Sequence, residues 1–138
     1  MSLVLVSHSK ALAEGLRDMV MQVAGDNVHV AAAGGTADGR LGTNADAVLD
    51  AIRATLADGG DGVLVLLDLG SAWLSVEMAL EELSDTERAR VHVSEAPLVE
   101  GAVLAAVQAS VGASLAEVAA AASGAATMSK APGGPRHA

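Results

Sequence analysis

Four short apolar segments alternate along this chain with segments of helical periodicity, and this alternation restricts the fold more than any other feature. The apolar segments are continuous, which is typical of strands buried on both faces of a parallel sheet. Parallel strands need crossovers that cover the sheet with helices. We therefore predict an α/β fold of three layers: a doubly wound parallel four-stranded sheet in the order 2-1-3-4, with helices on both faces. The predicted strands are Leu3–Val6, Val28–Ala33, Val63–Leu67 and Val91–Val93.

Apolar residues between the strands recur every three or four positions, which predicts helices with one buried face. Ser9 is the expected cap of the first helix, which ends at Gly25. The second begins near Thr43 or Asn44 and ends before Gly59, and three more cover residues 71–83, 97–110 and 114–122. The residues expected to face the core include Leu12, Leu16, Met19, Val20, Val23, Val48, Ile52, Leu56, Leu74, Met78, Leu98, Ala102, Ala105 and Val107.

The length of 138 residues fits a single domain. We place this domain at residues 1–123, because helical periodicity ends there. Residues 124–138 contain Gly and Pro without any periodicity, and we predict that this tail is disordered.

The composition excludes several classes of function. A formal net charge of −9 with only eight Lys and Arg residues argues against nucleic-acid binding and favours a protein partner with a basic face. The absence of cysteine excludes disulfides and a thiol nucleophile. We expect a cytoplasmic location and no membrane segment, because neither a signal-peptide pattern nor an apolar stretch of ~18 to 20 residues is present.

The candidate site lies where predicted strands end. His8 follows the first strand and Asp68 the third, and in the order 2-1-3-4 these two strands are neighbours. We expect the imidazole to donate one N–H to the carboxylate, which leaves the other ring nitrogen as a nucleophile or general base. A general base would serve a nucleophilic serine, and the chain has no Gly-x-Ser-x-Gly motif.

A direct histidine nucleophile suits phosphoryl transfer, which needs mainly positioning and charge stabilisation. Hydroxyl and backbone N–H donors are expected around the ring, and helix amino termini favour an anion there. We therefore predict a site with neither a metal nor a cofactor. The predicted phosphate-binding residues are Ser7, Ser9, Thr43, Gly70 and Ser71.

Several motifs in this order resemble a known family. They are Val6-Ser7-His8-Ser9, Ala13-Glu14-Gly15, Leu41-Gly42-Thr43-Asn44, residues 67–72 (Leu-Asp-Leu-Gly-Ser-Ala) and residues 96–101 (Ala-Pro-Leu-Val-Glu-Gly). Together they resemble the phosphotransferase subunits of the phosphoenolpyruvate-dependent dihydroxyacetone kinases, which are similar to mannose-type enzyme IIA domains. The resemblance covers roughly residues 3–122. Trp73 and the Gly/Pro tail depart from it.

The resemblance implies a phosphohistidine relay. His8 would accept phosphate from the histidine phosphocarrier protein and pass it to the ADP-binding subunit of the kinase, where ATP is regenerated. Asp68 would hold the ring, and the protein would form a homodimer. Some relatives carry phosphocarrier and enzyme-I-like domains after this one, so we expect phosphate to arrive here from a separate protein.

Other interpretations stay open at this point. The chain is also compatible with a mannose-type enzyme IIA of a sugar-transporting phosphotransferase system, which shares the chemistry but has another acceptor. A small-molecule or nucleotide-binding regulatory module on a flavodoxin-like scaffold is compatible with the fold. Asp68 is also a candidate helix cap, and Trp73 either a core residue or a surface anchor for a partner. His29 and His92 are expected to have packing roles.

Overall fold

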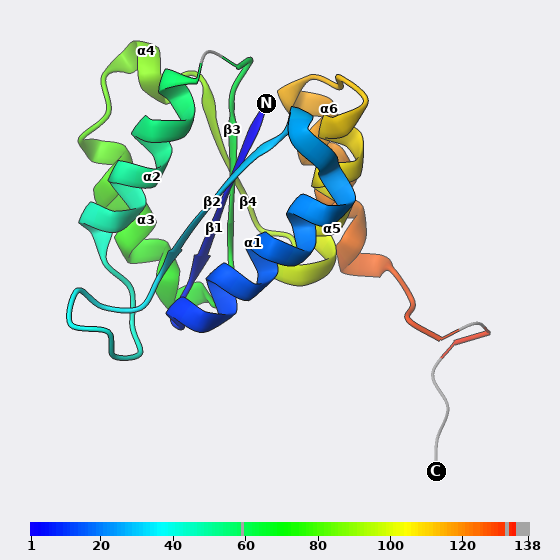
Figure 1. The fold of residues 1–138 in the computed structure, drawn as a ribbon, viewed down its shortest axis with the longest axis horizontal. Coiled ribbons are helices and arrows are strands. Elements are labelled where there is room, and N and C mark those ends of the chain that lie inside the picture. Colours follow the sequence, from blue (N-terminus) through cyan, green and yellow to red (C-terminus); the bar gives the residue numbers. More distant parts are fainter. Residues whose placement is uncertain (59, 132, 135–138) are drawn as a thin grey trace.

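Parallel strands form the centre of the computed structural model, which describes residues 1–58, 60–131 and 133–134 (Figure 1). In these residues the sheet has four strands in the order β2-β1-β3-β4, with every neighbouring pair parallel. The predicted fold and strand order are thus confirmed, and strand ends differ from the prediction by at most one residue. The strands are β1 (Ser2–Ser7), β2 (His29–Gly34), β3 (Val63–Leu67) and β4 (Val91–Ser94).

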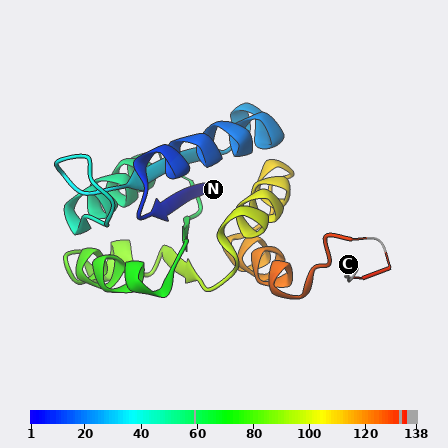
Figure 2. The ribbon, with the colours of Figure 1, turned by 90° about the horizontal axis from the view of Figure 1, so that it is seen from below.

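Helices cover both faces of the sheet (Figure 2). One face packs against α1 (Lys10–Ala24), α5 (Leu98–Ser110) and α6 (Leu115–Ser123). The other packs against α2 (Ala45–Ala57) and α3 (Trp73–Glu81). Alternate residues of each strand enter the two cores, which is why the strands read as continuous apolar segments. In the part of the chain that the structure describes, no helix is long and apolar enough to cross a membrane.

Side-chain caps set where several helices begin. Ser9 accepts a hydrogen bond from the Leu12 N–H at 3.2 Å, as predicted, and Asn44 accepts from residues 46 and 47. A short helix that we did not predict, α4 (Asp85–Arg88), follows α3. Ser84 and Glu87 form a reciprocal capping box there, and this Ser-x-x-Glu pattern was a signal in the sequence.

Six residues predicted to face the core are instead exposed, so this part of the prediction was wrong. In α1 the buried face is narrower than predicted and is formed by Ala13, Leu16, Val20 and Ala24. In α3 the residues buried against the sheet are Val76 and Ala79. Small side chains allow these helices to pack closely, so the larger apolar residues point to solvent. The exposed residues are Leu12, Met19, Val23, Leu74, Met78 and Val107.

The chain remains helical beyond the predicted domain boundary at residue 123. Residues Gly124–Thr127 form a 3₁₀ turn, η3, in which Ala125 is buried. Residues 132 and 135–138 of the predicted disordered tail lie outside the described residues. The boundary and the disorder of the tail stay predictions.

Gly34 gives a test of how tightly α1 packs on β2. An added Cβ at Gly34 would lie 2.5 Å from the Ser9 carbonyl oxygen and 2.9 Å from the Lys10 Cα. We expect Gly34→Ala to lower the free energy of unfolding by about 1–3 kcal/mol, because the backbone that follows His8 would have to move. Urea denaturation measures this change.

Gly15→Ala is the matched control for Gly34→Ala. Gly15 lies within α1, and an added Cβ there would meet nothing within 4 Å. We expect this variant to be more stable than wild type by up to about 1 kcal/mol, because alanine favours a helix. Equal stabilities of the two variants would contradict the close packing at Gly34.

Candidate functional site

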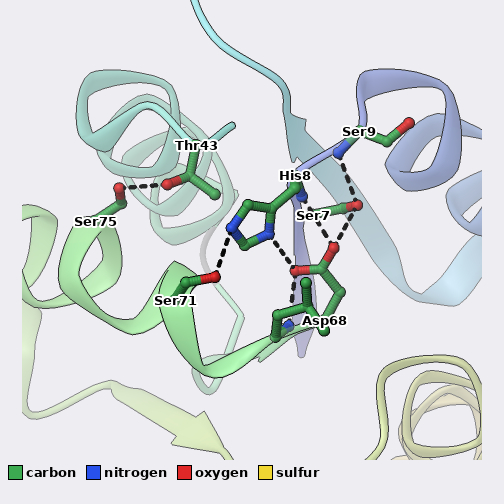
Figure 3. A network of polar contacts seen from close by, with 8 residues as sticks. Ser7, His8, Ser9, Thr43, Asp68, Ser71 and Ser75 are labelled. Atoms are coloured by element: carbon green, nitrogen blue, oxygen red, sulfur yellow. Dashed lines mark hydrogen bonds and ion pairs between the residues drawn. The ribbon is translucent and has the colours of Figure 1, made fainter. Parts of the chain in front are cut away.

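His8 lies at the carboxyl end of β1 with its backbone fixed on both sides (Figure 3). Its N–H donates to Asp68 Oδ2 at 3.0 Å, and its carbonyl oxygen accepts from the Gly42 N–H at 2.8 Å. The Asp68 N–H in turn donates to the Val6 carbonyl oxygen at 3.1 Å, which continues the β1–β3 pairing. The pairing of these strands therefore sets where the imidazole and the carboxylate meet.

The two ring nitrogens of His8 have different partners. Nδ1 lies 3.0 Å from Asp68 Oδ1, and Nε2 lies 2.8 Å from the Ser71 hydroxyl (Figure 3). Because a carboxylate only accepts hydrogen bonds, Nδ1 carries the proton and Nε2 keeps a lone pair that the Ser71 hydroxyl can bond. The His8 side chain is 25% exposed and that of Asp68 is 15% exposed. The ring is held in place and remains accessible to solvent.

Asp68 is kept ionised by the groups around it. Its partial burial works to raise its pKa. Hydrogen bonds from the His8 backbone N–H, the His8 ring and the Ser7 hydroxyl outweigh burial, so the pKa of Asp68 is lowered below its ordinary value of 3.8. Both oxygens are engaged: Oδ2 accepts from Ser7 and the His8 N–H, and Oδ1 accepts from the His8 ring and the Leu69 N–H.

The lowered pKa of Asp68 predicts a pH-dependent contribution to stability. A carboxyl whose pKa is lower in the folded state stabilises the fold above its unfolded pKa, and this contribution is lost as pH falls through the folded pKa. We expect the difference in free energy of unfolding between wild type and Asp68→Asn to be constant at neutral pH and to shrink as pH falls below 3.8. Urea denaturation at a series of pH values tests this, and a pH-independent difference would contradict it.

Of the predicted phosphate-binding side chains, only that of Ser71 contacts the His8 ring, and those of Ser7, Ser9 and Thr43 have other partners. Ser71 contacts Nε2, and Gly70 precedes it in the 3₁₀ turn η2 (Gly70–Ala72). The buried Ser7 hydroxyl donates to Asp68 and accepts from the Ser9 N–H at 3.0 Å. Ser9 Oγ caps α1, while Thr43 Oγ1 lies 2.6 Å from Ser75 Oγ. A phosphate-binding role for each of these residues stays a prediction.

Residues 68–72 form the turn that places the Ser71 hydroxyl at Nε2. Leu69 is extended, and η2 begins directly after it, with its backbone hydrogen bond from Ala72 to Leu69. The N–H groups of Gly70 and Ser71 precede this bond and point toward the amino end of the turn. An added Cβ at Gly70 would meet nothing within 4 Å, so internal packing does not require glycine there. The absence of a side chain leaves the backbone open to a ligand.

Sequence reasoning missed three polar partners at the site. These are the Gly42 N–H, which holds the His8 carbonyl, the Leu69 N–H, which donates to Asp68, and Ser75, which pairs with Thr43. Ser75 lies in α3, four residues after Ser71 of the preceding turn η2, and this helical spacing was a usable signal. The alternative role of Asp68 as a helix cap is not seen, since no side chain caps the start of η2.

Comparisons with known proteins show the family of this chain. Residues 2–119 match the EIIA-man family, described as the PTS system fructose IIA component. The chain is 49% identical over 107 residues to the PEP-dependent dihydroxyacetone kinase 2 phosphoryl donor subunit DhaM of Listeria innocua serovar 6a, covering 78% of this chain and 84% of the relative. It is 37% identical over 103 residues to the PTS-dependent dihydroxyacetone kinase phosphotransferase subunit DhaM of Lactococcus lactis subsp. lactis, covering 75% and 77%.

Other relatives are much longer than this chain. The DhaM subunit of Escherichia coli is 43% identical over 120 residues, which are 85% of this chain but only 25% of that protein. This chain therefore spans about a quarter of the length of that relative.

Solved structures show the same fold. The crystal structure of EF1359, a protein of unknown function, superposes with a TM-score of 0.77 at 34% identity, covering 88% of this chain and 92% of that one. The mannose/sorbose-specific IIA subunit of the phosphotransferase system from Enterococcus faecalis has a TM-score of 0.52 at 20% identity over 99% and 98%, which supports the fold alone. The chain thus belongs to the EIIA-man family and, within it, to the phosphoryl donor subunits of dihydroxyacetone kinase.

Proposed function

We propose that this chain carries a phosphoryl group on Nε2 of His8, from the histidine phosphocarrier protein to ADP held by the nucleotide-binding subunit of dihydroxyacetone kinase. The arrangement of the His8 ring carries the proposal: Nδ1 is bonded to Asp68, while Nε2 keeps its lone pair and is accessible. Dihydroxyacetone kinase enters the proposal because the DhaM relatives are named as its subunits. The homodimer implied by the resemblance stays a prediction.

In the first transfer, the Nε2 lone pair attacks phosphorus of the phosphocarrier's phosphohistidine. The new Nε2–P bond forms as the bond from phosphorus to the donor nitrogen breaks, and the His8 ring takes on positive charge. Asp68 stabilises that charge through Nδ1–H, as a carboxylate does beside an imidazolium. The Ser71 hydroxyl can turn from Nε2 to donate to a phosphoryl oxygen.

In the second transfer, an oxygen of the β-phosphate of ADP attacks the same phosphorus. The Nε2–P bond breaks, the ring returns to its neutral form, and ATP is the product. Because Asp68 stays bonded to Nδ1 throughout, the ring keeps its tautomer and its orientation for the next cycle. The open N–H groups of η2 offer partial positive charge to the phosphoryl oxygens in both steps.

The experiment that tests the proposal is intact-mass measurement after incubation with phosphoenolpyruvate, enzyme I and the phosphocarrier protein. We expect the mass to increase by one phosphoryl group, and we expect acid to remove it, because a phosphoramidate is acid-labile. Addition of the ADP-loaded kinase subunit should then remove the group and yield ATP. A chain that stays unmodified under these conditions would contradict the proposal.

A sugar-transport role is the second candidate, because the matching family is described as a fructose IIA component of the phosphotransferase system. Its chemistry at His8 would be the same, and only the acceptor would differ. Phosphorylated protein should therefore be divided between two reactions, one with the ADP-loaded kinase subunit and one with a sugar-transport IIB protein. Transfer to the IIB protein alone would favour this second candidate.

A further inference from the structure

A cavity of about 650 Å³ opens beside the His8 site, at the carboxyl ends of β3 and β4. Asp68 belongs to both places: its carboxylate binds the His8 ring, and the residue also lines the cavity. A protein docked on Nε2 would therefore also cover the mouth of this cavity. The cavity is lined by Leu67, Asp68, Leu69, Gly70, Trp73, Ser94, Glu95, Ala96, Pro97 and Ala126.

Trp73 gives the cavity an aromatic wall. It is the single aromatic residue of the chain, which has one Trp and no Phe or Tyr. Trp73 begins α3 and is 39% exposed, and the neighbouring Leu69 is 58% exposed. Core packing does not account for a tryptophan at this position, since the inner face of α3 is formed by Val76 and Ala79. Indole is the best aromatic partner for a cation.

The charges at the cavity are negative. Glu95 and Asp68 both line it, and no lining residue among those described is basic. Glu95 is exposed, and no Lys, Arg or His of the described residues forms an ion pair with it within 4.0 Å. Lys130, four residues after the lining residue Ala126, is paired with Glu100 at 2.7 Å. A cavity lined by an indole and by a carboxylate without an ion pair is complementary to a cation.

We propose that this cavity receives a guanidinium or ammonium side chain of the histidine phosphocarrier protein when that protein docks on His8, and that Trp73 and Glu95 determine specificity for it. The proposal rests on the proposed function. It is favoured by the net charge of −9, which favours association with a protein that presents basic groups.

Kinetics of phosphoryl transfer test the role of the two residues. We expect Glu95→Gln and Trp73→Leu each to raise the KM for the phosphocarrier protein about fivefold, with kcat within about twofold of wild type, because the lost contacts act on docking and not on Nε2. Glu81→Gln is the matched control, since Glu81 is an exposed glutamate at the far end of α3. It should leave both constants unchanged.

Fluorescence tests occupancy of the cavity directly, because Trp73 is the sole tryptophan. The probes are N-acetyl-arginine amide and N-acetyl-citrulline amide, which have nearly the same shape but differ in charge. We expect the arginine probe to cause a saturable change in Trp73 emission of the wild type. The Glu95→Gln variant should bind this probe with at least threefold lower affinity, as expected for one lost charged contact. The citrulline probe should give no saturable change.

The outcomes separate this inference from the proposed function. If wild type is phosphorylated on His8 and Glu95→Gln shows the same KM as wild type, the inference on the cavity is overturned while the carrier function stands. Equal binding of the arginine and citrulline probes overturns it as well, because the cavity would then accept a neutral group. If wild type takes no phosphate at all, the proposed function itself fails.

Discussion

Replacement of His8 by alanine is expected to reduce labelling from phosphoenolpyruvate to background and to abolish ATP formation by the kinase subunits. The variant lacks the nitrogen that would bond phosphorus. The neighbouring hydroxyls of Ser7 and Ser71 are much weaker nucleophiles than a neutral imidazole nitrogen and do not replace it. Intact mass after incubation with the phosphocarrier system measures the effect. Labelling of His8→Ala at the wild-type level would refute the assignment.

The remaining histidines provide controls for His8→Ala. The chain has four histidines. His29 begins β2 at the opposite end of the sheet, and His92 lies within β4. His29→Ala and His92→Ala should be labelled as fast as wild type, because neither ring is near Asp68. Circular dichroism of all three variants verifies that they remain folded.

Asp68→Asn is expected to slow phosphoryl transfer by about 10⁴-fold, comparable to the loss when the carboxylate partner of a catalytic histidine becomes an amide. Each carboxylate oxygen of Asp68 accepts from one backbone N–H, of His8 or of Leu69. The amide NH₂ must replace one of these oxygens, so one backbone N–H loses its acceptor. If the NH₂ faces the ring, Nδ1 becomes the acceptor and the proton moves to Nε2, which removes the nucleophile.

Another histidine–aspartate pair provides the matched control for Asp68→Asn. His29 Nδ1 lies 3.5 Å from Asp58 Oδ2 at the end of the sheet opposite to His8. Asp58→Asn makes the same chemical change on an exposed pair and should leave the transfer rate unchanged. Single-turnover transfer from the phosphorylated phosphocarrier protein measures both rates. If the two variants behave alike, Asp68 has no special role in transfer.

The fold was predictable because its main signals are local. Segments such as Val63–Leu67 are too short for helices and too apolar for exposed strands, and their alternation with helices leaves few topologies. The order 2-1-3-4 places His8 next to Asp68 at the carboxyl ends of neighbouring strands. That contact depends only on strand order and register, which explains why it is seen in the structure at 3.0 Å.

Features that depend on the rotation of a helix or the course of a turn were not predictable in the same way. Leu74 and Met78 have the spacing of a buried face, but the sheet receives Val76 and Ala79 instead. Spacing fixes which residues share a face and not which face meets the sheet. The pairing of Thr43 with Ser75 likewise depends on the loop between β2 and α2, whose path is set by long-range contacts such as that of Gly42 with His8.

The anchoring of His8 has a consequence for how a carrier of this kind must work. Its N–H and its carbonyl oxygen are both bonded to other parts of the chain, so the residue cannot travel as the end of a swinging arm does. A phosphoryl group is transferred only when a partner protein docks on the same small area around His8. The donor protein must therefore dissociate before the acceptor protein can bind. Under the proposed function, the two half-reactions then follow a ping-pong scheme.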